Sequence, residues 1–238
     1  MTDFPGLSQQ PSGTAARPLL GMTILVVEDS LYACDAMRLM CLHSGARIRR
    51  ADCLRSARRH LQVYRPSAIV IDLGLPDGSG LDLIAELADA SPRVTSILAT
   101  SGEDGAEEAA RVAGADGFLD KPLSNLGTFQ QAILATLPSD RQPAGPRMVR
   151  DEVLRPDPLA YRDDMIHVSN LLDEHREGPV LDYVAQFLGG VARSADDMAL
   201  ASAADALGQQ RRGGAALNAR LAQVAGLVQE RLSNRVAM

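Results

Sequence analysis

The sequence predicts an α/β domain with a doubly wound, five-stranded parallel sheet, followed by a small all-α domain. Between residues 22 and 138, short apolar runs alternate with stretches of helical composition. These runs are continuous in Val, Ile and Leu, which is typical of parallel strands covered on both faces. Beyond a proline-rich break the strand pattern stops, and the remaining segments carry helix caps and helical periodicity.

The alternation predicts the position of each element. The expected strands are residues 22–27, 46–51, 67–73, 94–100 and 117–120. The expected helices are residues 31–43, 53–64, 80–89, 104–113 and 124–137. In sheets of this kind a functional site forms at the carboxyl ends of the strands, beside the point where the strand order reverses.

Composition divides the chain into four segments. Residues 1–21 are rich in Pro, Gly, Ser and Gln and are predicted to be a disordered leader. Residues 22–138 are the α/β domain, the proline-rich residues 139–156 are expected to be a linker, and residues 157–238 are the helical domain.

Caps and periodicity predict the helices of the last segment. Asp157 suits the N-cap of a first helix that Gly178 would close. A second helix would start at Pro179, and Ser194 with Asp197 forms a variant of the capping box that could begin a third. An amphipathic last helix is predicted by apolar residues at steps of three and four: Leu217, Leu221, Val224, Val228 and Leu232.

The charge of the chain argues against nucleic-acid binding. There are 14 basic and 17 acidic residues through Val149, then 10 and 13 from Arg150 onward, so each half carries −3 of the net −6. Neither half has the positive charge of a nucleic-acid-binding domain. No apolar run reaches the roughly 18–20 residues of a membrane span, and no hydrophobic block follows a charged start. We therefore expect a cytoplasmic protein that does not interact with membranes.

Acidic residues stand at the ends of two expected strands. Glu28 and Asp29 follow the first strand, and Asp72 ends the third. If those strands are neighbours, three carboxylates meet, and clustered like charges raise one another's pKa or require a cation. Hard oxygen ligands with no Cys or His nearby predict Mg²⁺.

A cation and hydroxyl groups are expected at the same edge. Lys121, at the end of the fifth strand, is the only lysine in the chain. An ammonium is a compact point charge that suits one phosphate or carboxylate oxygen, whereas a planar guanidinium is bulkier. Thr100 and Ser101 end the fourth strand, and Ser101, which a glycine follows, better suits a phosphoryl group that must be approached closely.

These residues resemble the receiver domains of two-component response regulators, which have a flavodoxin-like fold. The resemblance covers about residues 22–138 and is carried by the motifs "ILVVEDS", "IVIDLGLPDGSGLDLI", "TSG" and "GADGFLDKPL", in that order. It implies a phosphoprotein that takes a phosphoryl group from a phosphohistidine on a sensor histidine kinase or a histidine phosphotransfer protein. We expect such a protein to act in a phosphorelay and not to be an enzyme.

The resemblance also implies roles for individual residues at the metal and phosphoryl site. Asp72 is the counterpart of the phosphoacceptor, and Asp29, with Glu28 helping through water, is the counterpart of the carboxylate pair that holds Mg²⁺. The metal would also take Asp72 itself and the backbone carbonyl of Gly74. Lys121 is the counterpart of the ammonium partner of the phosphoryl group.

Three more residues are assigned to the response that follows phosphorylation. Ser101 is the counterpart of the hydroxyl that reports the phosphoryl group. Phe118, with Thr100, is the counterpart of the switch that turns inward afterwards.

One residue departs from the family pattern: Gly74 has no side chain to orient or block the hydrolytic water, and Glu103 would sit two residues past Ser101. We therefore expect phosphorylated Asp72 to be long-lived.

The output of the helical domain stays open. We interpret its acidic charge and its lack of a helix-turn-helix signature as evidence against DNA binding and in favour of signalling to an unknown protein target. A homodimer is compatible with this interpretation. The alternatives are a transcriptional regulator with an atypical helix-turn-helix, and a phosphorelay intermediate or phosphate sink. His167 and His175 lack the sequence setting of a phosphotransfer histidine, and a degenerate bundle of that kind remains a further alternative.

Overall fold

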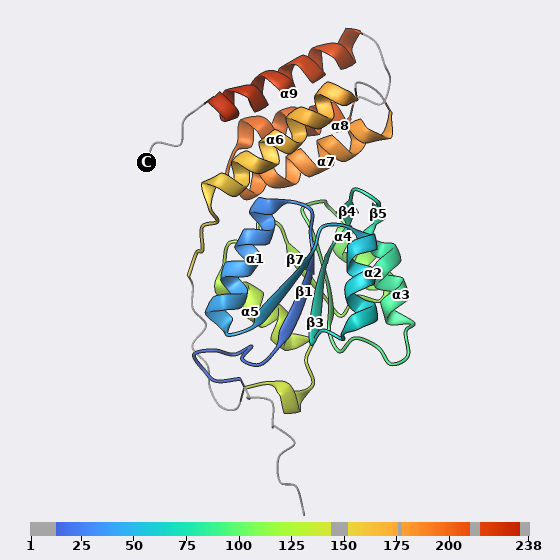
Figure 1. Ribbon diagram of the computed structural model, residues 1–238, viewed down its shortest axis with the longest axis vertical. Helices are drawn as coiled ribbons and strands as arrows, with labels where there is room; N and C mark the ends of the chain where they lie inside the picture. Colours follow the sequence, from blue (N-terminus) through green and yellow to red (C-terminus); the bar gives the residue numbers. More distant parts are fainter. Residues whose placement is uncertain (1–12, 144–151, 176–177, 210–214, 234–238) are drawn as a thin grey trace, which may run out of the picture.

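The computed structural model describes residues 13–143, 152–175, 178–209 and 215–233 (Figure 1). Its first part is a five-stranded parallel sheet in the order β2-β1-β3-β6-β7, which confirms the predicted fold class. The strands are β1 Thr23–Val27, β2 Arg47–Ala51, β3 Ala68–Asp72, β6 Ile97–Ser101 and β7 Gly117–Asp120. All residues of β3 and β6 are buried, which explains their continuous apolar runs.

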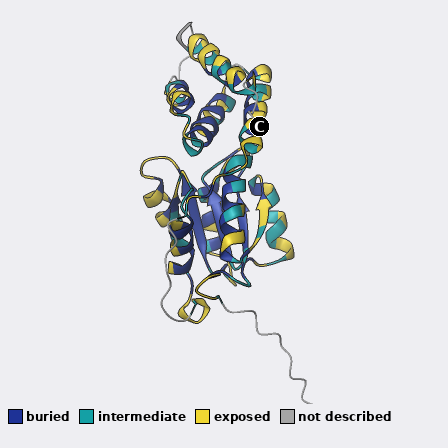
Figure 2. Cartoon of the chain, turned by 90° about the vertical axis from the view of Figure 1, so that its left-hand side faces the viewer, coloured by how far each residue is buried: buried dark blue, intermediate teal, exposed yellow. Residues whose placement is uncertain are grey.

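Helices cover both faces of this sheet, as expected for a doubly wound fold (Figure 1). One face carries α1 Leu31–Ser44 and α5 Leu126–Ala135, whose Met37, Met40 and Phe129 are fully buried against the strands. The other face carries α2 Leu54–Val63, α3 Gly80–Ala88 and α4 Ala106–Ala113. Figure 2 shows the buried sheet between helices whose outer faces are exposed.

Two short strands after β3 were not predicted. They are β4 Gly74–Leu75 and β5 Gly78–Ser79, and they pair antiparallel. Gly78 has a φ of 146°, a backbone conformation that residues with side chains rarely adopt. Because the hairpin follows Asp72 directly, it holds Gly74 beside the carboxyl end of β3.

The leader and the linker are partly packed on the α/β domain, which differs from the prediction for those parts. Leu19 is fully buried in the core beside α1, and its N–H donates to the carbonyl of Ser44 at 2.9 Å. Leu154 is also buried there, and its N–H donates to the carbonyl of Ser124 at 2.9 Å. These two segments are held on the α/β domain because the side chains of Leu19 and Leu154 are buried in its core. Residues 1–12 and 144–151, the rest of these predictions, lie outside the described residues.

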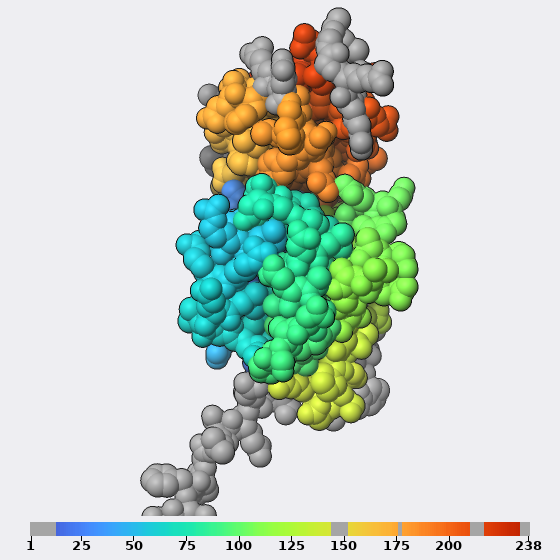
Figure 3. Space-filling view, turned by 90° about the vertical axis from the view of Figure 1, so that its right-hand side faces the viewer, coloured from blue at the N-terminus to red at the C-terminus, as the bar shows by residue number. Residues whose placement is uncertain are grey.

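The C-terminal part is helical, as predicted, and we call it the helical unit. It consists of α6 Pro158–Glu174, α7 Pro179–Ser194, α8 Met198–Gly208 and α9 Ala215–Ser233. A core of its own includes the buried residues Met165, Val168, Leu188, Val191, Ala204 and Val224. The unit sits over the carboxyl ends of the strands, with α9 farthest from the sheet (Figure 1), and it rests against the α/β domain without a visible gap in Figure 3. None of the described helices combines the length and the apolar character needed to cross a membrane.

The predicted caps of the helical unit are only partly correct. Asp157 caps α6 by accepting from the N–H of Leu159. Ser194, however, is the last residue of α7 and donates to the carbonyl of Gly190, so it does not begin the third helix. Asp197 is the N-cap of α8 instead, because its carboxylate accepts from a backbone N–H there and is held by other side chains of the unit. The first helix ends at Glu174, before the expected Gly178.

Candidate functional site

Three carboxylates meet at the carboxyl edge of the sheet. Because β1 and β3 are neighbours with Val27 opposite Ile71, the residues that follow, Glu28 and Asp72, come side by side. One carboxylate oxygen from each of Glu28, Asp29 and Asp72 lies within 4.8 Å of those of the other two. The structure therefore brings together the acidic residues that the sequence placed at separate strand ends.

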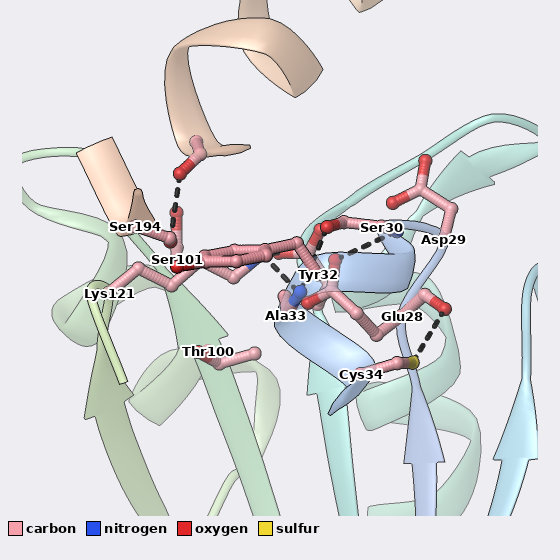
Figure 4. Close-up of polar contacts among 12 residues, drawn as sticks. Glu28, Asp29, Ser30, Tyr32, Ala33, Cys34, Thr100, Ser101, Lys121 and Ser194 are labelled. Carbon is pink, nitrogen blue, oxygen red and sulfur yellow. Dashed lines mark hydrogen bonds and ion pairs between the residues drawn. The ribbon is translucent and has the colours of Figure 1, made fainter. Parts of the chain in front are cut away.

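Lys121 forms ion pairs with two of these carboxylates. Its Nζ lies 2.8 Å from Oε2 of Glu28 and 3.1 Å from Oδ1 of Asp72. The backbone N–H of Lys121 continues the β6–β7 pairing by donating to the carbonyl of Ser101 at 2.9 Å, so the strand register places the ammonium at the site. The peptide bond to Pro122 is cis. Figure 4 shows Lys121 and Ser101 at the strand ends on one side and Glu28 and Asp29 on the other.

Burial and the neighbouring charges shift the pKa values of the residues in this cluster. Desolvation, together with the neighbouring carboxylates and against the opposing effect of Lys121, raises the pKa of Glu28 to about 8. Desolvation and the charge of Asp72 raise the pKa of Asp29 to about 7. Burial disfavours the charged form of Lys121, but Asp72 and Glu28 more than offset it, and the pKa of Lys121 is raised.

The donor set fits a divalent cation. Three clustered carboxylates and one ammonium, which contacts Glu28 and Asp72, have formal charges of −3 and +1, so a formal charge of −2 remains at the site. All the side-chain donors are carboxylate oxygens, the ligands that Mg²⁺ prefers, and Mg²⁺ needs only one or two of them beside water and phosphate oxygens. A bound cation would relieve the repulsion that raises the pKa values of Glu28 and Asp29.

The two hydroxyl residues that end β6 lie in different surroundings. Thr100 is fully buried, and its Oγ1 donates to the carbonyl of Leu119 at 2.8 Å. Ser101 lines the cavity beside the carboxylates, and its Oγ accepts from the N–H of Glu103 at 3.2 Å. Phe118, on β7, is half-buried against the core formed with α2, α3 and α4, and it does not line this cavity.

The helical unit also contributes residues to the site, and no sequence pattern predicts them. The hydroxyl of Tyr183, on α7, donates to Oδ2 of Asp29 at 2.7 Å. The amide Nε2 of Gln186, one turn later, donates to Oε1 of Glu103 at 2.8 Å. Burial and Asp29 raise the pKa of Tyr183, so its hydroxyl keeps its proton. Both residues are ordinary members of a helix in the sequence, with no motif around them.

The cavity at the site is small and shared by both parts of the chain. Its volume is about 30 Å³, enough to hold a water molecule. Asp72, Gly74 and Lys121 line it from the α/β domain. Gln186 and Arg193 line it from α7.

Comparisons with known proteins identify a family match in the first part of the chain. The family model described as "Response regulator receiver domain" matches residues 24–133. The KDP operon transcriptional regulatory protein KdpE of Escherichia coli is 32% identical over 114 residues, covering 48% of this chain and 50% of that protein. The probable transcriptional regulatory protein TcrX of Mycobacterium tuberculosis is 32% identical over 105 residues, covering 43% and 44%. The matches thus span about half the length of these relatives.

Solved structures give matches over a similar length. The chemotaxis response regulator CheY4 of Vibrio cholerae has 23% identity and a TM-score of 0.44, covering 49% of this chain and 98% of that one. A response regulator from Chloroflexus aurantiacus, described as putative, has 28% identity and a TM-score of 0.41, covering 43% and 86%.

Proposed function

Because residues 24–133 form a response regulator receiver domain, we propose that this chain accepts a phosphoryl group on Asp72 and acts as the response regulator of a two-component phosphorelay. The donor is a phosphohistidine of a sensor histidine kinase or of a histidine phosphotransfer protein. One observation carries this proposal: Asp72 lies at the end of a buried strand within reach of both an ammonium and two further carboxylates.

Each residue of the cluster has a task in the transfer. A carboxylate oxygen of Asp72 attacks phosphorus in line, an oxygen–phosphorus bond forms, and the nitrogen–phosphorus bond to the donor histidine breaks. Lys121 places its charge against the equatorial phosphoryl oxygens, and the imidazole leaves with the electron pair. Since the chemistry needs little beyond placement and charge, a preorganised and buried cluster suits it.

Asp29, Asp72 and the carbonyl of Gly74 would hold Mg²⁺ here, with Glu28 acting through water. When bound, this ion supplies positive charge that neutralises the phosphoryl oxygens during transfer. The excess of buried carboxylates over ammonium groups supports the assignment.

The response to phosphorylation passes through β6 and β7. The hydroxyl of Ser101 moves to the new phosphoryl oxygens, and Phe118 turns into the space left behind, with Thr100 beside it in the core. This shifts an equilibrium between two arrangements of the domain. The helical unit then signals through contacts with a protein target.

A second candidate function is transcriptional regulation by DNA binding. It is favoured by the names of the curated relatives, which are transcriptional regulatory proteins. The similarity spans only about half of those proteins, however, and residues from Arg150 onward carry a charge of −3, which phosphate groups would repel. Retention of the whole protein on DNA that weakens steeply with salt would favour this candidate.

The test of the proposed function is direct. The protein is incubated with acetyl phosphate and Mg²⁺, and its intact mass is compared with that of Asp72→Asn. We expect one phosphoryl group on the wild type, which does not form when the metal is chelated before acetyl phosphate is added, and none on the variant. Equal incorporation in Asp72→Asn would show that another residue is the acceptor.

The partners can be found with the same variant. Asp72→Asn and the wild type treated with beryllofluoride and Mg²⁺ present the unphosphorylated and the phosphorylated forms. A protein retained by only one of them is the expected downstream target. A target that binds both forms equally would contradict signalling through phosphorylation.

A further inference from the structure

The acceptor site opens onto α7 of the helical unit. The cavity at the acceptor is lined by Asp72 and Lys121 and, across from them, by α7, whose last residue, Ser194, lies beside Ser101 (Figure 4). The cavity left between them has about 30 Å³, room for a water molecule but not for a phosphoryl group together with the imidazole that delivers it.

The first attachment of this cover is at the acidic cluster itself. The hydroxyl of Tyr183 lies 2.7 Å from Oδ2 of Asp29, and it occupies one lone pair of a carboxylate that we assign to the metal. A cation at Asp29 and this hydrogen bond therefore compete for the same oxygen atoms.

The second attachment lies above Gly74. A Cβ on this glycine would meet Cδ of Gln186 at 2.6 Å, so the amide of Gln186 fills the space that a side chain at position 74 would take. The same amide donates to Glu103 in the loop after β6. Gln186 thus bridges the loops on both sides of Asp72, across the mouth of the site.

The third attachment lies on α1 and is formed by Asp164 of α6. Its carboxylate accepts from the hydroxyl of Ser30 at 2.8 Å and from the N–H groups of Leu31 and Tyr32 at 2.8 and 3.1 Å. These groups are the N-terminus of α1, where a carboxylate is favoured by the helix dipole. This contact does not touch the acceptor Asp72, although the N–H of Ser30 also donates to Oε1 of Glu28 at 3.2 Å.

We infer that the helical unit is a removable cover on the acceptor site, held by Tyr183, Gln186 and Asp164, and that it excludes the phosphohistidine donor while it is docked. In-line transfer requires the donor nitrogen, the phosphorus atom and the Asp72 oxygen to lie roughly on one line. Because Asp72 ends β3, that line leaves the sheet through the space that α7 occupies. This inference rests on the proposed function of Asp72.

The attachments suit a cover that opens. They are polar contacts, joined by the packing of Tyr32 of α1 against Tyr161 and by a hydrogen bond from the N–H of Asp157 to Asp35, and interfaces between domains that move relative to each other are of this mixed kind. The chain between the two parts is anchored at Leu154, which is buried in the core of the α/β domain, and α6 begins four residues later. The unit can therefore swing about residues 155–157 while its own core stays intact. A phosphoryl group on Asp72 would add three oxygen atoms to this cavity of about 30 Å³, so we expect phosphorylation and docking to oppose each other.

Two variants at separate attachments test the inference in the whole chain. Gln186→Ala removes the bridge over Gly74, and Asp164→Asn weakens the contact with the N-terminus of α1. The rate of phosphorylation by acetyl phosphate at saturating Mg²⁺ should rise about 2- to 10-fold in each variant. The reason is that the loss of one hydrogen bond shifts the equilibrium between the docked and undocked forms by roughly that factor. Gln229→Ala is the matched control, since it removes a hydrogen bond to Ser169 inside the helical unit and should leave the rate unchanged.

A second readout follows the cover itself. The N–H groups of Leu31 and Tyr32 are protected by Asp164, so their hydrogen exchange in the wild type should accelerate when beryllofluoride and Mg²⁺ are added. If all chains take up phosphate at one rate and this exchange does not change, the cover is refuted while the proposed function stands. If Asp72 takes up no phosphate in any chain, the proposed function fails and the inference fails with it.

Discussion

The hydroxyl of Tyr183 donates a hydrogen bond to Oδ2 of Asp29 at 2.7 Å, although 154 residues separate them in the chain. This contact joins the helical unit to the cluster that we assign to Mg²⁺. The hydrogen bond stabilises the docked arrangement and withdraws electron density from a metal ligand. Docking and metal binding are therefore expected to oppose each other.

Replacing Tyr183 with Phe should strengthen Mg²⁺ binding. The ring and its packing against Phe187 are retained, while the competing hydrogen bond is lost. A hydrogen bond of this kind contributes about 0.5–1.5 kcal/mol, so the dissociation constant should fall about 2- to 10-fold by titration calorimetry. Tyr161→Phe is the control, because Tyr161 donates to Asp197 inside the helical unit. Equal affinities in all three proteins would show that Tyr183 does not compete with the ion.

Lys121→Arg should separate metal binding from signalling. The side chain of Lys121 is only 9% exposed and fits between Glu28 and Asp72, where a planar guanidinium is too large. Mg²⁺ binding should persist, because the positive charge and the carboxylates remain. Signalling should be lost, because the guanidinium does not place its charge against the phosphoryl oxygens as the ammonium does, so the phosphorylated variant should not retain the target that the phosphorylated wild type retains. A phosphorylated variant that retains the target normally would contradict the role given to the ammonium.

Overpacking next to Lys121 should also cost stability. We expect Lys121→Arg to lower the free energy of unfolding by about 1–3 kcal/mol, as is common for larger side chains in filled sites. Urea unfolding followed by circular dichroism measures this. An exposed site with the reverse change, Arg111→Lys, is the control and should change little, since its partner Glu108 is exposed as well.

Gly74→Ala should loosen the cover from the opposite side. The added Cβ displaces the amide of Gln186, which then loses its contact with Glu103. Exchange of the Leu31 and Tyr32 N–H groups should become several-fold faster than in the wild type. Gly190→Ala is the matched change on α7, where an added Cβ meets no atom within 4 Å. It should leave docking unchanged and stabilise the helix by up to about 1 kcal/mol.

The pair of Asp197 and Arg231 should make the stability of the helical unit depend on pH. The hydrogen bond from Arg231 lowers the pKa of Asp197 below its ordinary value of 3.8. A carboxyl group whose pKa is lowered by folding contributes stability above its unfolded pKa and loses it as the pH falls through the folded pKa. Asp197→Asn should therefore be less stable than the wild type at pH 7, by up to about 1 kcal/mol for this partly exposed pair.

That difference should shrink as the pH falls below about 3.8, when the wild-type carboxyl group is protonated too. Urea unfolding at several pH values measures it. Asn can still cap α8, so the loss does not come from the cap. Glu230→Gln alters an exposed partner of the same Arg231 and should show a smaller effect. A difference that is constant from pH 3 to pH 7 would exclude the titration of Asp197 as its cause.

The acidic cluster could be predicted because it depends on local patterns. Glu28, Asp29, Asp72 and Lys121 each follow an apolar run, and the order of runs and helices implies a parallel sheet. All strands of such a sheet end at one edge, so residues far apart in sequence meet without any further information. The partial burial of the leader and of residues 152–154 was missed because single apolar residues, Leu19 and Leu154, hold them, and composition averages such residues away.

The sequence by itself determined the α/β fold, the helical nature of the second part, and the set of charged groups at the strand ends. Only the tertiary structure decided that Tyr183 binds Asp29, that Gln186 binds Glu103 in the loop after β6, and that Asp164 binds the start of α1. The reason is physical: helix periodicity marks which side of α7 is buried but not what buries it. The docking of two separately packed units depends on the shape and polar pairing of both surfaces, and no local pattern along the chain records these.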